Sequence, residues 1–201
     1  MILSLSIPAG LGMMLIADPF VMVILTPEFA AAIPVIQILA LYGILSTGLG
    51  NLHGVYMAVG QASRSAYFAF VETGVRLPIL VAGIVYWGMI GAAWAMVISG
   101  AISLVYGLWL IVRHFGVSLP AIGLNIWRVL LSAGVMVVCV QLVADLLKEL
   151  GPIWHLAGGV IIGLVVYGGT LMLLWRLMGC PMGPERTLVE WLSARTKAGI
   201  G

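Results

Sequence analysis

Two oppositely charged side chains lie inside an apolar run that is long enough to cross a membrane. The run SAYFAFVETGVRLPILVAGIVY carries Glu72, Arg76 and Pro78 near its middle. Residues four apart share one face of a helix, so Glu72 and Arg76 can pair. A charge at mid-membrane costs at least roughly 2.5–3.5 kcal/mol, so such residues face protein or a water-filled cavity. Pro78 favours a kink beside the pair because it frees a backbone carbonyl. This stretch is the first candidate for a functional site.

Four further polar side chains in apolar runs are candidates for a substrate or ion pathway. Asp18, next to Pro19, is either solvated near a membrane interface or a carboxylate that lines a cavity or couples transport to a cation. Gln37 and Asn51 serve either hydrogen bonds between helices or the wall of a hydrophilic cavity. His53 is either a satisfied polar residue or a proton relay.

The sequence offers no catalytic constellation. It contains no HExxH, no GxSxG with a usable base and no Walker loop. Its three histidines are far apart, and Cys139 and Cys180 lack the spacing of metal ligands. No basic and aromatic patch indicates nucleic-acid binding. We therefore expect a protein that is not an enzyme, with no catalytic residues, no metal site and no cofactor.

Composition places the chain in a membrane. Of its 201 residues, 63% are hydrophobic and 8% are charged, whereas soluble domains carry about 25% charged residues. Spanning segments must be helices or a closed barrel, because lipid cannot satisfy backbone polar groups. The apolar runs are too long for barrel strands and do not alternate in polarity.

We therefore expect an all-α integral membrane protein, a bundle of six transmembrane helices within residues 1–178. The expected spans are about 2–25, 32–57, 66–86, 88–112, 129–147 and 155–178. A tail, 179–201, follows and contains a short amphipathic segment. The run begins apolar at Met1 with no cleavable signal, which is also compatible with a truncated start.

Basic residues predict the orientation. Seven fall on the side that holds the N-terminus and the even-numbered connections: Arg64, Arg113, Arg128, Arg176, Arg186, Arg195 and Lys197. Lys148 alone falls on the other side. The excess of basic residues in cytoplasmic segments places the seven, and both termini, in the cytoplasm.

Several loose motifs occur in a fixed order and together carry a family resemblance. They are the run TPEFAAAIPVIQILAL, the segment YMAVGQASRS, the segment RLPIL and the segment YWGMIGAAWA. In this order the chain resembles the C-terminal half of oligosaccharide flippases. These form the polysaccharide-transporter branch of the multidrug/oligosaccharidyl-lipid/polysaccharide (MOP) exporter superfamily. The resemblance covers roughly residues 1–178.

The resemblance implies a function and a missing partner. Such transporters have two six-helix lobes around a central cavity, so this chain would be the second lobe and would need a first. They move oligosaccharide linked to undecaprenyl diphosphate across the bacterial inner membrane for surface polysaccharides such as O-antigen, lipopolysaccharide and exopolysaccharide. Transport is expected to use alternating access coupled to a proton or sodium gradient.

In that picture Arg76 would meet a diphosphate or an acidic sugar, and Glu72 would hold Arg76 or take a proton. The alternative role of the pair is purely structural. Two other functions stay open. One is a drug or small-metabolite exporter of the same superfamily, and the other is a membrane scaffold subunit that transports nothing.

Overall fold

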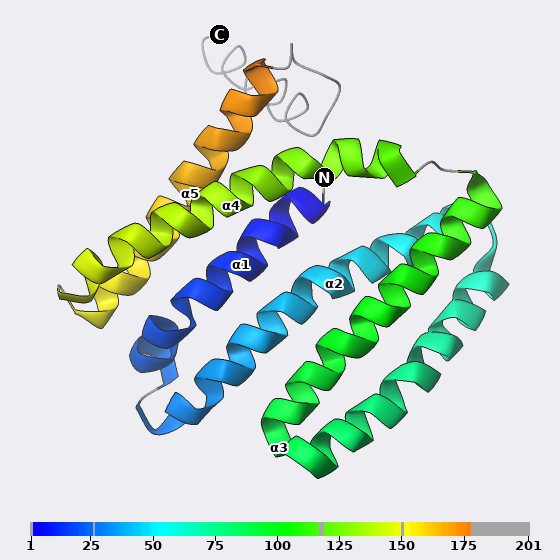
Figure 1. Ribbon diagram of the computed structural model, residues 1–201, viewed down its shortest axis with the longest axis horizontal. Helices are drawn as coiled ribbons and strands as arrows, with labels where there is room; N and C mark the ends of the chain where they lie inside the picture. The colour runs from blue at the N-terminus through cyan, green and yellow to red at the C-terminus, as the bar shows by residue number, and fades with distance from the viewer. Residues whose placement is uncertain (1, 26, 117–118, 150, 178–201) are drawn as a thin grey trace, which may run out of the picture.

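The computed structural model is built from helices throughout the residues that it describes, which are 2–25, 27–116, 119–149 and 151–177 (Figure 1). The expected amphipathic segment of the tail lies outside these residues. Five helices are long and apolar enough to cross a membrane. Such helices are the expected form of a chain with this composition, since each satisfies its backbone groups internally. The chain is thus an all-helical, membrane-embedded protein.

The first two helices form an antiparallel pair. Helix α1 (Ile2–Phe20) contains Pro19 and passes into a π-helical turn, Val21–Leu25, directly after it. Proline cannot donate the hydrogen bond that an α-helix needs, so Pro19 leaves the carbonyl one turn earlier without its helical partner. A short 3-10 helix, Pro27–Ala32, then leads into α2 (Ile33–Ala58).

Helix α3 (Ala62–Phe115) is folded back on itself as a hairpin. Its dihedral angles leave the helical region at Gly88, where φ is 61° and ψ is −138°. This conformation is nearly exclusive to glycine. Figure 1 shows the two resulting arms, 62–87 and 89–115, running in opposite directions. Pro78 lies within the first arm, whose dihedral angles stay helical around it.

The last two helices also form a hairpin. Helix α4 (Leu119–Glu149) begins about ten residues before the span expected at 129, and helix α5 (Pro152–Leu177) follows it. Pro120 lies in the first turn of α4, where no N–H is needed for a helical hydrogen bond, so it does not break the helix. Gly151, with φ of 104°, makes the turn between α4 and α5.

The helices pack around two apolar cores. One lies between α1, α4 and α5 and contains Ile7, Val129, Ala133, Met136, Val140 and Tyr167. The second lies between α2 and both arms of α3 and contains Leu49, Leu52, Tyr56, Phe68 and Ile111. Helices α1 and α2 join the two halves along their lengths (Figure 1). Glu72 and Arg76 lie on the first arm of α3 and belong to the second half, whereas Asp18 lies on α1.

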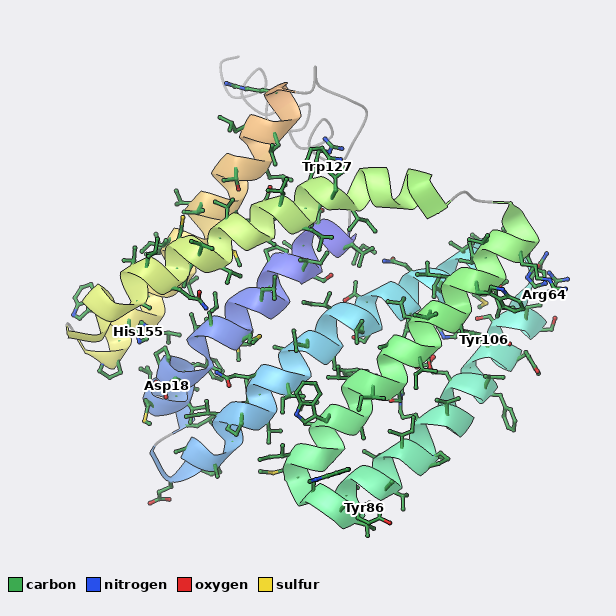
Figure 2. The ribbon with its side chains drawn as sticks, in the orientation of Figure 1. Asp18, Arg64, Tyr86, Tyr106, Trp127 and His155 are labelled. Carbon is green, nitrogen blue, oxygen red and sulfur yellow. The ribbon has the colours of Figure 1, made fainter. Side chains whose placement is uncertain are left out.

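The two ends of the helix bundle differ in charge. Arg64 lies at one end and Tyr86, at the tip of the α3 hairpin, lies at the opposite end together with Asp18 (Figure 2). Arg113, in the last turn of α3, lies at the Arg64 end because the two arms are antiparallel. Arg64 and Arg113 thus lie at the same end of the α3 hairpin, opposite its tip.

Candidate functional site

A tight turn brings α2 and the first arm of α3 against each other. Residues 59–61 connect them, and Gly60 adopts a φ of 74° that suits glycine. Because the two segments are antiparallel, residues near the end of α2 face residues near the start of the arm. His53 is thereby placed opposite Ser65 and Phe68.

Four polar side chains form a continuous chain across this interface, which we call the Arg76 cluster: Ser65, His53, Glu72 and Arg76. His53 Nδ1 lies 3.0 Å from Ser65 Oγ, and His53 Nε2 lies 3.3 Å from Glu72 Oε2. Arg76 Nη2 donates to the other carboxylate oxygen, Glu72 Oε1. A neutral His53 with its proton on Nε2 satisfies both contacts, since the Ser65 hydroxyl then donates to Nδ1.

Glu72 is therefore held from two sides. Its side chain is 12% exposed, compared with 28% for His53 and 26% for Arg76. Each carboxylate oxygen accepts one hydrogen bond, one from α2 and one from its own helix. The Glu72 carboxylate thus links His53 to Arg76, since each of them bonds one of its oxygens.

Arg76 keeps part of its binding capacity free. Its Nε is buried and has no hydrogen-bond partner in the described residues. The guanidinium also lies over the ring of Tyr42 on α2, 5.7 Å from the ring centroid, which is within cation–π range. A guanidinium presents five donors, and Glu72 occupies one edge of it. The planar guanidinium of Arg76 can therefore bind another anionic group, a phosphate or a carboxylate, when Glu72 moves away from it.

The cluster extends from Ser65, three residues from the start of the first arm, to Glu72 and Arg76 farther along it. Glu72 is ten residues from the start of the arm at Ala62, which is about 15 Å along the axis at 1.5 Å per residue. This is about half the thickness of a hydrocarbon core of about 30 Å. Ionised groups at this depth are costly and are typical of substrate or ion pathways.

The structure brings three of the six candidate residues together and leaves three elsewhere. His53, Glu72 and Arg76 meet in the cluster. Gln37 Nε2 instead donates to the Met14 carbonyl at 3.3 Å and links α2 to α1. Asp18 is exposed at the far end of α1 (Figure 2). Asn51 is half-buried and lies about 200° around the helix from His53, on another face of α2.

Two members of the site escaped the sequence analysis. Tyr42 precedes His53 by eleven residues, which is close to three full turns, so a helical wheel of α2 would have placed them on one face. Ser65 is the first residue of the apolar run that carries the charged pair, but only the turn geometry sets it against His53. Groups of three or more metal-ligating side chains are not found among the described residues.

The fold and the cluster define an all-helical membrane protein with an ion pair within one of its long apolar helices. Comparison with known proteins adds two distant similarities. The chain is 25% identical over 139 residues to the "Teichuronic acid biosynthesis protein TuaB" of Bacillus subtilis (strain 168). It is 28% identical over 99 residues to an "Uncharacterized membrane protein in cps region" of Klebsiella pneumoniae.

The matches take in 68% and 49% of this chain and only 28% and 20% of the lengths of the two relatives. The chain thus spans well under half of either protein. No family model matches the sequence, and no solved structure matches it.

Proposed function

We propose that the chain is one lobe of a transporter that flips lipid-linked oligosaccharide across the bacterial inner membrane for surface polysaccharide synthesis. The observation that carries the proposal is the Arg76 cluster, a partly free guanidinium at mid-depth in an apolar helical bundle. The two relatives support the setting, because one is named for the biosynthesis of teichuronic acid and the other for a cps region. The resemblance to oligosaccharide flippases supports the same class.

The substrate that suits the cluster is an undecaprenyl-diphosphate oligosaccharide. A diphosphate offers several anionic oxygens, and the guanidinium fork binds such groups in a bidentate manner. Without substrate, Glu72 neutralises Arg76 and His53 holds Glu72 in place. Arrival of the diphosphate exchanges one anionic partner of Arg76 for another, so the arginine is not left unpaired at mid-depth.

The transport cycle that we propose uses alternating access between two lobes, coupled to a proton or sodium gradient. In the lobe that we propose, the two arms of α3 are separate crossings, which with the other four long helices makes six spans; the reversal of the chain at Gly88 supports this count. An odd number of segments before the Gly88 tip places that tip outside the cell, and both termini lie in the cytoplasm with the basic end of the bundle. A second six-helix lobe completes the central cavity.

The test is an Arg76→Gln substitution in the chromosomal gene. The full natural gene product then carries the substitution. We expect surface polysaccharide to fall at least tenfold while the lipid-linked precursor accumulates. Arg64→Gln is the matched control, because Arg64 is exposed and bonds Gln61 on its own helix end. Unchanged polymer and precursor in Arg76→Gln would refute the role of this residue.

A second candidate is a scaffold subunit in which the cluster only fixes the packing of α2 against α3. The bonds of His53 to both Ser65 and Glu72 favour it, since they join the two helices. A scaffold needs a stable fold, and it does not need a charged side chain that binds substrate. It therefore predicts that replacing Glu72 and Arg76 together by apolar residues leaves polymer production intact.

A further inference from the structure

The buried face of α4 carries two polar groups that lack partners among the described residues. Arg128 is 7% exposed and Ser132 is 0% exposed. Neither Arg128 Nη1 nor Ser132 Oγ has a hydrogen-bond partner there. The two residues are one turn apart and share a helix face. A buried cation without a counter-ion is strongly unfavourable, so this guanidinium calls for an anion.

Farther along the same face of α4 lies an apolar cavity, and Arg128 and Ser132 are not part of its lining. Met136 and Val140 follow Ser132 at steps of four residues, and both line a cavity of about 260 Å³ between α1, α4 and α5. An apolar cavity of about 150 Å³ already binds a small hydrocarbon. Leu5 and Leu164 also line it, and both are largely exposed, so the cavity opens sideways to the surface that a bilayer would cover.

The spacing of the cation and the cavity matches that of a phospholipid. Eight residues separate Arg128 from Met136, which is about 12 Å along the helix axis. One leaflet of hydrocarbon is about 15 Å deep, half of about 30 Å. Arg128 follows Trp127, a residue type that favours the interface between headgroups and hydrocarbon. Val129, the next residue, packs in one core cluster with Ile7 near the start of α1.

We propose that Arg128, Ser132 and this cavity form a binding site for an anionic phospholipid. The phosphate accepts hydrogen bonds from the Arg128 guanidinium and the Ser132 hydroxyl, and an acyl chain fills the cavity between α1 and α5. One guanidinium and one hydroxyl supply donors for a single phosphate, and the apolar lining of the cavity suits an acyl chain. The site lies in the other half of the bundle from the Arg76 cluster, and it does not depend on the proposed transport function.

The experiment is lipid analysis by mass spectrometry of the full protein purified from membranes in mild detergent. The wild type is expected to retain phosphatidylglycerol in near-stoichiometric amount, well above phosphatidylethanolamine. Arg128→Gln is expected to lower that amount at least tenfold. Arg64→Gln, a change of the same charge on an exposed residue, is the matched control and is expected to retain the lipid.

A second variant tests the cavity separately. Gly12 lines the cavity, and a Cβ added there meets nothing within 4 Å, so Gly12→Leu places an apolar side chain at the cavity wall. It is expected to lose the phospholipid while keeping Arg128 intact, and to remain monodisperse on size exclusion.

Several results would overturn the proposal. These are no retained phospholipid in the wild type, equal retention by Arg128→Gln or by folded Gly12→Leu, and equal loss from Arg64→Gln. Retention of a polyprenyl diphosphate in place of phospholipid would assign the site to another lipid and would also overturn it.

Discussion

Arg76 and Glu72 depend on each other more than on any other residue of the described bundle. Glu72 is 12% exposed and neutralises a guanidinium at mid-depth. Removing one member of a buried ion pair leaves an uncompensated charge and costs about 3–5 kcal/mol, whereas replacing both by apolar residues is often neutral. Stability and transport can therefore be separated by comparing single and double variants.

We expect Glu72→Gln to lower the free energy of unfolding by about 1–3 kcal/mol, less than for a fully buried pair because Arg76 is 26% exposed. The double variant Glu72→Leu, Arg76→Leu should unfold near the wild-type temperature and still fail to support polymer synthesis. Thermal unfolding in detergent, followed by Trp fluorescence, compares the stability of both variants with that of the wild type. A double variant that restores both stability and polymer would leave the scaffold function as the explanation.

His53 shows what side-chain chemistry the sequence could and could not reveal. The spacing of Glu72 and Arg76 indicated their pairing, because an i, i+4 pair depends only on one helix. The contact of His53 with Glu72 joins residues 19 apart and depends on how α2 and α3 turn at Gly60. No local pattern encodes that distance. The functional roles of all six candidate residues stay predictions.

At the scale of elements, glycines allow the hairpin of α3 to close. The backbone of Gly83 in the first arm meets that of Gly91 in the second so closely that a Cβ on Gly91 would overlap the Gly83 carbonyl oxygen. Ala95 of the second arm packs against Gly83. Close approach of small residues is the usual basis of helix association in membranes, where the hydrophobic effect does not drive helices together.

We expect Gly91→Val to destabilise the hairpin by about 1–3 kcal/mol, since the arms must move apart. Gly74→Val is the matched control on the same helix, because a Cβ added at Gly74 meets nothing within 4 Å. Its effect should stay within about 0.5 kcal/mol. Chemical unfolding of both variants in one detergent gives the comparison, and equal losses would show that the Gly83–Gly91 contact is unimportant.

The elements themselves follow from the sequence more readily than their joints. Apolar runs of about 20 residues predict helices, and the all-helical fold with long apolar helices is confirmed. Helix α4 begins before the span expected at 129, and Pro120 lies in its first turn, where proline is tolerated. The number of crossings and the pairing of two lobes stay predictions, since they depend on the membrane and on a partner.

At the scale of the whole molecule, the account requires one orientation in the membrane. Arg64 marks the end that we place in the cytoplasm, and Tyr86 marks the opposite, external end (Figure 2). The neighbouring Trp87 is 73% exposed, and Gln61 lies in the connection between α2 and α3. A label at position 61 therefore reports the Arg64 end of the bundle, and a label at position 87 reports the Tyr86 end.

We expect a membrane-impermeant maleimide to label Trp87→Cys in spheroplasts and to label Gln61→Cys only after permeabilisation. Both cysteine variants should also carry Cys139→Ala and Cys180→Ala, which remove the two thiols of this chain. The opposite pattern would invert the topology, and labelling of both positions from one side would contradict the assignment of the α3 arms as two crossings.

The central claim is that Arg76 handles the diphosphate of a lipid-linked oligosaccharide during its passage between leaflets. The most direct measurement is the distribution of that lipid between leaflets, read with an impermeant glycan-oxidising reagent on spheroplasts. In the wild type and in Arg64→Gln, the account predicts that most of the lipid-linked oligosaccharide is accessible from outside. In Arg76→Gln it predicts at least a tenfold lower accessible fraction with an unchanged or larger total. An accessible fraction equal to that of the wild type would contradict the account.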